Sequence, residues 1–342
     1  MRRLGMLLAL AVLLLPAVVA GQDAARMSRS PMLEEEMKRD YRRPPAVPFP
    51  ADNPWTPERE QLGRMLFFDP RLSSSRVTSC ATCHNPAFSW GDALPKAIGY
   101  EHRPAARRTP TILNAAWADL LYWDGRADGL EAQALDPIEA AYEMNMPIEQ
   151  MLAGLNAIEG YRRLFELAYA REGITRQTVA KALATFERTV VSGVAPFDDW
   201  VNGRENAVSE SARRGFVLFN DKAGCAVCHS GWNLSDQGFH DIGLPSADRG
   251  RGALVPVRAL EHAFKTPTLR NVAERAPYMH DGSLASLAEV IEFYDRGGMA
   301  RPSRSPEMRA LRLSAGEKDD LLAFLRTLTG VEAPVSVPIL PR

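Results

Sequence analysis

The spacing of apolar residues along the chain is mostly that of amphipathic helices. Apolar side chains recur at intervals of three and four, which predicts helices at residues 147–170, 177–192, 209–219 and 283–296. Ser314 and Glu317 form a capping box that opens a further helix, which Gly330 ends. No stretch shows a convincing run of strands. The pattern therefore predicts a mainly α protein.

Segments rich in proline and glycine separate the helical ones. They are predicted to be loops and lie at residues 41–57, 85–110 and 230–257. Loops of this kind commonly supply the walls of a cofactor site. Residues 21–57 and 331–342 are predicted to be extended arms.

The first twenty residues differ from everything that follows. A pair of arginines precedes an apolar run from Leu4 to Val19, which only a glycine and a proline interrupt, and small residues follow it. This run is shorter than the about 20 apolar residues that span a bilayer, so we interpret residues 1–20 as a cleaved secretory signal. The mature protein is then expected in the periplasm, without a membrane span.

Charge is less informative than the cysteines. The 41 Lys and Arg residues nearly balance the 42 Asp and Glu residues. The chain therefore lacks the excess of positive charge that is typical of proteins that bind nucleic acids. The four cysteines form two copies of C-x-x-C-H, namely Cys80-Ala81-Thr82-Cys83-His84 and Cys225-Ala226-Val227-Cys228-His229. In this motif both thiols form thioethers to a porphyrin and the histidine ligates the iron. A redox dithiol and half a zinc site are the alternatives. Two complete copies in an exported chain favour two covalently bound c-type haems, with His84 and His229 as proximal ligands.

An internal repeat surrounds the two motifs. Gly-x-x-Leu-Phe precedes each one, at Gly63 and Gly215, and Thr-Pro-Thr follows each one, at Thr109 and Thr266. An Asp-Gly pair stands fifteen positions beyond each of these threonines, and a leucine six further on. The chain is therefore predicted to be a tandem of two homologous haem domains. The predicted order is a signal peptide at 1–20, an extended arm at 21–57, an N-terminal haem domain at 58–204, a C-terminal haem domain at 205–330 and a tail at 331–342.

The two halves differ at one aligned position. Tyr294 and Pro137 each stand thirteen residues past the aspartate of the Asp-Gly pair. A phenolate can ligate iron, whereas proline has no group that binds it. The second haem is therefore predicted to be closed by Tyr294, while the first keeps an open face above His84. The alternative for Tyr294 is a packed core aromatic, and Pro137 is also an ordinary residue at the start of a helix.

Two residues near Pro137 suit an open haem face. Cleavage of a bound peroxide needs a group that moves a proton from the inner to the outer oxygen, and a carboxylate such as Glu143 could do this. Gln133 could orient the peroxide or a water molecule. The alternative for Glu143 is a solvated loop carboxylate.

These residues resemble those of a known family, the bacterial di-haem cytochrome c peroxidases and MauG. The likeness runs from about Pro57 to Gly330 and is carried by the segments LGRMLFFDPRLSSSRVTSCATCHNP, TPTILNAAW, WDGRADGLEAQ, EMNM, FKTPTLRNV and PYMHDGSLASL. The resemblance implies a mostly α-helical pair of cytochrome c-like domains, each with a haem, and peroxide as the oxidant. It also implies roles for four residues: Glu143 as the catalytic glutamate, Gln133 and Pro137 as residues of the open face, and Trp123 as a bridge between the haems.

The chain departs from the peroxidases of this family at three places. Tyr294 stands where the peroxidases have a methionine ligand and MauG has a tyrosine. Tyr100 replaces the histidine that plugs the iron in peroxidases that need reductive activation, so we expect an open first haem, with His102 close but displaced. Arg108 and Arg275 replace two residues of the inter-domain calcium site. Calcium therefore has only weak support, and a guanidinium is an alternative source of the positive charge.

The leading hypothesis is a MauG-like, hydrogen peroxide-dependent di-haem oxidoreductase. It activates peroxide at the N-terminal haem and stores oxidising equivalents on both haems, which an external electron donor, a small redox protein or a protein substrate, then consumes. One alternative is a conventional cytochrome c peroxidase that takes electrons from a small cytochrome or copper protein. The other, of a different class, is a non-enzymatic di-haem electron carrier.

Overall fold

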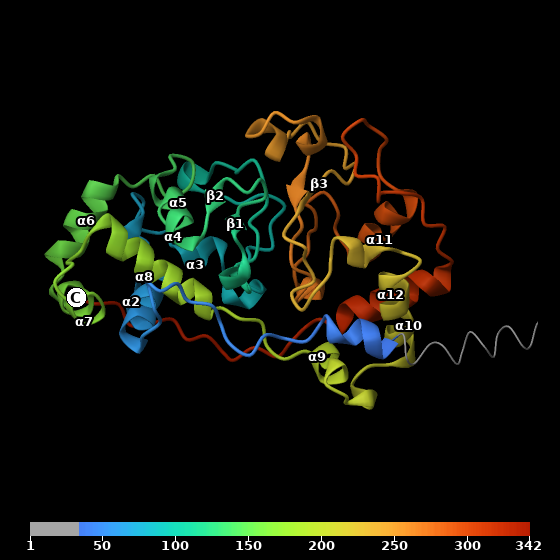
Figure 1. Cartoon of the computed structure of the whole chain (residues 1–342). Coiled ribbons are helices and arrows are strands. Elements are labelled where there is room, and N and C mark those ends of the chain that lie inside the picture. Colours follow the sequence, from blue (N-terminus) through green and yellow to red (C-terminus); the bar gives the residue numbers. More distant parts are fainter. Residues whose placement is uncertain (1–33) are drawn as a thin grey trace, which may run out of the picture. The chain divides into compact units, whose positions relative to one another are not determined.

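The computed structural model describes residues 34–342, so the signal peptide predicted at residues 1–20 lies outside the described residues (Figure 1). Residues 34–39, part of the segment predicted to be an extended arm, are helical and belong to a unit that ends at Asp40. Tyr41–Arg342 form a second unit. This second unit holds every residue that the sequence assigns to the haem sites.

Helices supply most of the regular structure of the second unit. In chain order they are α2 (Pro57–Phe67), α3 (Cys80–Cys83), α4 (Leu130–Gln133), α5 (Asp136–Glu139), α6 (Ile148–Ala157), α7 (Glu159–Ala168), α8 (Arg176–Thr189), α9 (Pro196–Val201), α10 (Glu210–Asn220), α11 (Leu287–Arg296) and α12 (Ala315–Arg326). The strands have two residues each and form two antiparallel pairs, β1 (Leu120–Leu121) with β2 (Ala127–Asp128) and β3 (Phe239–His240) with β4 (Phe264–Lys265). The predicted mainly α class is confirmed.

The predicted helices are present, with differences in their limits. The stretch 147–170 forms two helices, α6 and α7, because Ile158 between them has an extended backbone (φ −95°, ψ 114°). α11 begins later than predicted because Ser286 caps it by accepting a hydrogen bond from the backbone N–H of Glu289. The capping box of Ser314 is present, but α12 ends at Arg326, before the predicted glycine.

Each half contains two helices that cross at a glycine. Gly63 in α2 lies against α8, where an added Cβ would overlap the carbonyl oxygen of Ala182. Gly215 in α10 lies against α12, where an added Cβ would overlap the carbonyl oxygen of Asp320. The repeated Gly-x-x-Leu-Phe motif is therefore a helix-crossing motif, in which the missing side chain permits close approach. The repeat extends to α8 and α12, which the sequence comparison did not pair.

The asparagine that follows each Thr-Pro-Thr motif turns the chain in the same way. Asn114 and Asn271 both have left-handed backbones (φ 59° and 54°), which asparagine tolerates better than most residues. Their N–H groups donate to the carbonyl oxygens of Val190 (2.9 Å) and Leu328 (3.0 Å), just beyond the ends of α8 and α12. Equivalent hydrogen bonds thus tie the motif to the equivalent helix in each half.

The two ends of this unit each pack on the opposite half (Figure 1). At the start of the unit, the Tyr41 hydroxyl donates to Oδ1 of Asn220 in the C-terminal half (2.7 Å). The C-terminal tail has no helix or strand and runs back to the N-terminal half, where the N–H of Gly160 donates to the carbonyl oxygen of Arg342 (3.1 Å). The two ends of this unit therefore connect its two halves.

We expect Gly215→Ala to destabilise the protein, because its methyl group would overlap the backbone of α12. Overpacking of this kind costs about 1–3 kcal/mol, which the midpoint of chemical denaturation would measure. Gly154→Ala is the matched control, since a Cβ at Gly154 in α6 meets nothing within 4 Å and alanine there should add about 0.5–1 kcal/mol of stability. Wild-type stability of Gly215→Ala would contradict the close helix crossing.

Candidate functional site

One large cavity extends past both C-x-x-C-H motifs. Its volume is about 1360 Å³, which exceeds the about 300–1,000 Å³ of an ordinary small-molecule pocket. The cavity is lined by every residue that the sequence assigns to the site: Cys80, Cys83, His84, Trp123, Gln133, Pro137, Glu143, Cys225, Cys228, His229 and Tyr294. The fold thus brings the predicted residues together, while their individual roles stay predictions.

Each attachment motif begins with a short helical turn. The first is α3, and the second is a 3-10 turn at Cys225–Val227. Among the described residues the four cysteines form no disulfide, and all four line the cavity. Burial raises the thiol pKa to about 12 for Cys83 and about 11 for Cys228. A reactive dithiol needs a lowered thiol pKa, so these surroundings do not favour the redox-dithiol alternative.

The two motif histidines are held in the same way. Nδ1 of His84 lies 3.3 Å from the carbonyl oxygen of Trp90, and Nδ1 of His229 lies 2.9 Å from that of Leu234. When Nδ1 carries the proton it donates to this carbonyl, which leaves the lone pair of Nε2 for a metal ion. Burial lowers the pKa of both imidazoles and so favours the neutral form that ligates iron.

The Thr-Pro-Thr repeat contributes to the same two sites. The backbone of Pro110 acts on His84, and the backbone of Pro267 acts on His229; each opposes the larger effect of burial on the imidazole pKa. The repeated sequence therefore marks the wall beside each histidine. Two thiols and one neutral imidazole at each end of a large cavity fit two covalently attached haems.

The helical segment that carries the aligned Tyr and Pro differs between the halves. α11 is continuous from Leu287 and brings Tyr294 to the cavity. In the first half the equivalent stretch is interrupted, because α4 ends at Gln133 and α5 begins at Asp136 with Pro137 in its first turn. Pro137 stands in the first turn of α5 and lines the cavity, so its position is compatible both with a helix start and with the predicted open haem face.

Tyr294 lies beside the second attachment motif. Burial raises the pKa of its phenol far above the ordinary value, and the thiols of Cys225 and Cys228 raise it further. An adjacent ferric iron would reverse this shift, because a nearby positive charge favours the phenolate. Tyr294 also packs against the core cluster that contains Phe293 and Met308. The position is thus compatible with both packing and iron ligation.

A hydrogen-bonded group next to Pro137 includes a residue that the sequence did not single out. Nε2 of Gln133 donates to the hydroxyl of Tyr122 (3.3 Å), and this hydroxyl donates to Oδ2 of Asp136 (3.3 Å). The guanidinium of Arg126 lies over the Tyr122 ring, 3.3 Å from its centroid. Tyr122 therefore positions the amide that is predicted to orient peroxide. Only the fold reveals this, because the two residues lie on different segments.

Glu143 lies on the loop that follows α5. Its N–H donates to the carbonyl oxygen of Ala140, and its own carbonyl oxygen accepts from the N–H of Tyr100, both at 2.9 Å. Burial raises the pKa of its carboxyl group, against the opposing charge of Arg126. A raised carboxyl pKa suits proton transfer closer to neutral pH. Glu143 is partly buried in the cavity wall, so it is not the solvated carboxylate of the alternative interpretation.

The loop that replaces the plugging histidine stays at the edge of the cavity. Of its described residues Gly99 lines the cavity, whereas Tyr100 and His102 do not. The N–H of Tyr100 also donates to the carbonyl oxygen of Tyr142 (3.2 Å), which holds the loop against the segment that carries Glu143. This placement is compatible with the expected open face of the first haem.

Trp123 is held by hydrogen bonds from both halves. Its indole Nε1 donates to the carbonyl oxygen of Arg108, and its own carbonyl oxygen accepts from the N–H of Lys265, both at 2.8 Å. The indole lies 6.4 Å from the ring of His280, which stacks on Phe264 at 3.6 Å. The indole is therefore held by both halves, which is compatible with the bridge that the resemblance implies.

Two buried ionisable groups in the cavity wall were not predicted. Burial raises the pKa of Glu187 to about 8 and lowers that of Lys265 to about 8. The Glu187 carboxyl acts on the thiol of Cys80, and Nζ of Lys265 donates to the carbonyl oxygen of Leu120 (2.6 Å). In the sequence both look like ordinary surface charges, because only tertiary packing buries them.

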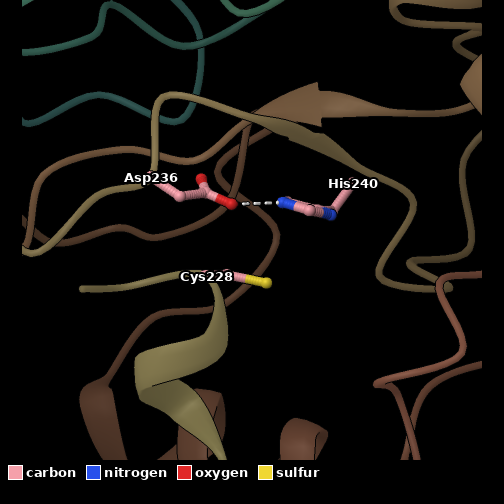
Figure 2. A group of neighbouring side chains, drawn as sticks. All are labelled: Cys228, Asp236 and His240. Atoms are coloured by element: carbon pink, nitrogen blue, oxygen red, sulfur yellow. Dashed lines mark hydrogen bonds and ion pairs between the residues drawn. The ribbon is translucent and has the colours of Figure 1, made fainter.

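Figure 2 shows three further side chains with metal-ligating atoms, Cys228, Asp236 and His240. Their ligand atoms lie within 4.8 Å of one another, and Nε2 of His240 is 2.7 Å from Oδ2 of Asp236. Cys228 belongs to the second C-x-x-C-H motif, so its sulfur is needed for haem attachment. The Asp236–His240 pair therefore lies beside the second haem site and is not an independent metal centre.

Comparison with known proteins matches the chain in two parts. The di-haem cytochrome c peroxidase family matches residues 57–206, and the cytochrome c family matches residues 212–329. The methylamine utilization protein MauG of Methylorubrum extorquens is 52% identical over 89% of this chain and 88% of that protein. MauG of Methylophilus methylotrophus is 49% identical over 88% of this chain and 91% of that protein.

One solved structure supports the same assignment. The crystal structure of a MauG-like protein associated with microbial copper homeostasis superimposes with a TM-score of 0.79 at 33% identity, covering 84% of this chain and 95% of that chain. These matches confirm the predicted tandem of cytochrome c-like domains and the two c-type haems.

We expect Glu143→Gln to slow the reaction with peroxide by about 10²–10⁴-fold, the usual contribution of a proton-transfer group, while both haems stay attached. The wild-type rate should fall as the pH drops through the carboxyl pKa, because only the ionised form accepts a proton. Since burial raises this pKa, the loss begins above the ordinary range of glutamate. Stopped-flow absorbance measures both effects, with the exposed Glu149→Gln as control. A wild-type rate in Glu143→Gln would show that Glu143 does not transfer this proton.

We expect Tyr122→Phe to slow the same reaction by about 2- to 10-fold, the equivalent of one lost hydrogen bond. The variant leaves Gln133 in place but removes the hydroxyl that orients its amide. Tyr100→Phe, which alters a tyrosine outside the cavity wall, is the control. An equal loss in both variants would show that the Tyr122 hydroxyl has no specific function.

Proposed function

Because the chain belongs to the di-haem cytochrome c peroxidase family that includes MauG, we propose that it is a hydrogen peroxide-dependent di-haem oxidoreductase of the MauG type. It activates peroxide at the N-terminal haem and stores the oxidising equivalents on both haems until an external donor is oxidised. The observation that supports this most strongly is the difference between the two ends of the cavity. Tyr294 lines the end with the second motif, and Pro137 occupies the equivalent position in the first half.

At the first site the chain supplies the proximal ligand and the groups that handle peroxide. When bound, the haem supplies an iron that binds peroxide and changes its oxidation state. His84 would hold the haem iron, and Pro137 has no group that could ligate it. Glu143 takes a proton from the inner oxygen of peroxide and returns it to the outer oxygen. Gln133, oriented by Tyr122, positions the peroxide.

At the second site His229 would hold the haem iron with a neutral imidazole, and Tyr294 would hold it with a phenolate. An anionic oxygen ligand stabilises the oxidised states of iron, which suits a site that stores oxidising equivalents. Trp123, which is held by both halves, carries electrons between the two sites.

The proposed organisation assigns residues 58–204 to the peroxidatic haem domain and residues 205–330 to the electron-transfer haem domain. A periplasmic location follows from the secretory signal interpreted at residues 1–20. In the part of the chain that the structure describes, no helix combines the length and the apolar character needed to cross a membrane. The proposed partners are hydrogen peroxide and either a small redox protein or a protein substrate.

We expect Tyr294→Met to keep both haems attached but to change the state that stoichiometric peroxide produces, because a methionine ligand raises the reduction potential of haem iron. Optical and Mössbauer spectra after peroxide addition measure this. Tyr278→Phe is the matched control, since Tyr278 lines the same cavity but its hydroxyl donates to the carbonyl oxygen of Val272 (3.0 Å). Unchanged spectra in Tyr294→Met would reject Tyr294 as the ligand.

The resting wild-type protein separates this proposal from its alternatives. An open first haem should give a high-spin ferric EPR signal, whereas two six-coordinate haems, as in an electron carrier, would give low-spin signals alone. Rapid peroxide-dependent oxidation of a reduced small cytochrome would instead indicate a conventional cytochrome c peroxidase.

A further inference from the structure

Two buried arginines, one from each half, contact each other in the wall of the large cavity. Arg108 and Arg275 are each 7% exposed, and both line the large cavity. Nη2 of Arg108 donates to the carbonyl oxygen of Arg275 (2.5 Å), and Nη2 of Arg275 donates to the carbonyl oxygen of Thr268 (2.5 Å). The first contact joins the two arginines, and the charge of Arg108 acts on the guanidinium of Arg275.

The protein does not neutralise this pair. Neither arginine takes part in an ion pair with a described residue, and Nε of each has no hydrogen-bond partner. Burial lowers the pKa of both, that of Arg275 to about 9, and the charge of Arg108 contributes to the lowering at Arg275. The carboxylate of Asp92 acts on Arg108 from a distance and accepts a hydrogen bond from Oγ1 of Thr109 (2.6 Å).

Two other arginines of this chain are each paired with a carboxylate. Arg270 is fully buried, but its Nη1 lies 2.8 Å from Oδ1 of Asp198. Arg107, next to Arg108 in the chain, bridges Asp124 (2.6 Å) and Asp248 (2.7 Å). A buried charge without such a partner is costly, and two adjacent like charges cost more. A negatively charged group on a molecule in the cavity would supply the missing partner.

We infer that Arg108 and Arg275 form a carboxylate-binding clamp that holds propionate groups of the haems and takes the place of a divalent cation between the two halves. Haem carries two propionates, and guanidinium groups pair with carboxylates in a fixed, often bidentate, geometry. Calcium needs six to eight oxygen ligands and would be repelled by two neighbouring guanidinium groups.

The position of the clamp indicates that it serves both haems. Arg108 immediately precedes Thr109-Pro110, whose backbone reaches His84. Arg275 is anchored to Thr268, the residue after the proline whose backbone reaches His229. The backbone of Arg108 also accepts the indole hydrogen bond of Trp123. The clamp, the indole and the two proximal histidines thus belong to one connected group.

The test measures haem midpoint potentials by spectroelectrochemical titration of the purified di-haem protein. Arg108→Gln and Arg275→Gln should shift the potentials to lower values, because removal of a positive charge near the propionates stabilises the ferric state. Arg309→Gln is the matched control, since Arg309 also lines the cavity but is exposed. Equal potentials in the wild type and in both glutamine variants would overturn the inference.

Two further measurements cover the case in which a glutamine variant does not fold. Arg108→Lys and Arg275→Lys keep the charge, so their potentials should stay near the wild-type values, and a large fall would overturn the clamp. The wild-type protein, dialysed against calcium and then against calcium-free buffer, should contain no stoichiometric calcium by atomic emission. Tightly bound calcium whose removal by a chelator alters the haem spectra would also overturn it.

Discussion

The hydrogen bond between each buried imidazole and a backbone carbonyl is the constraint on which the rest of the site depends. When Nδ1 carries the proton, this bond fixes the ring orientation and leaves Nε2 of each imidazole available to hold a metal ion. The carbonyl groups belong to Trp90 and Leu234, which both have left-handed backbones (φ 61° and 48°). Such a backbone is unfavourable for a bulky residue and persists where the surroundings enforce it. The same strained turn in both halves is therefore part of how each haem site is built.

The two sites differ because one helix is continuous and its equivalent is not. α11 carries Tyr294 as a regular helical residue, whereas the equivalent stretch stops after Gln133 and restarts with Pro137. The break puts a proline at the position that Tyr294 has in the other half and leads into the loop that carries Glu143. Under the proposed function a change in this one segment would give a duplicated scaffold one closed and one open site.

The parts of the site that depend on fixed spacing could be predicted from the sequence. The two C-x-x-C-H motifs, the Thr-Pro-Thr repeat and the aligned Tyr294 and Pro137 could all be found without a structure. Properties that depend on packing could not. Tyr122 gains its partners from α4 and α5, and Glu187 and Lys265 are buried only by segments distant in the chain. The equivalence of α8 and α12 was missed because it shows in the helix crossings at Gly63 and Gly215 and not in a shared sequence motif.

The contacts between the C-terminal tail and the N-terminal half have a consequence for the order of folding. The N-terminal half is completed by contacts from the last residues, because the N–H of Gly160 bonds to the carbonyl oxygen of Arg342 and the guanidinium of Arg71 to that of Pro341 (3.0 Å). These contacts cannot form until residues 341 and 342 have been synthesised. The half that carries Cys80 and Cys83 is therefore completed only after the C-terminal half has been made, although it comes first in the chain.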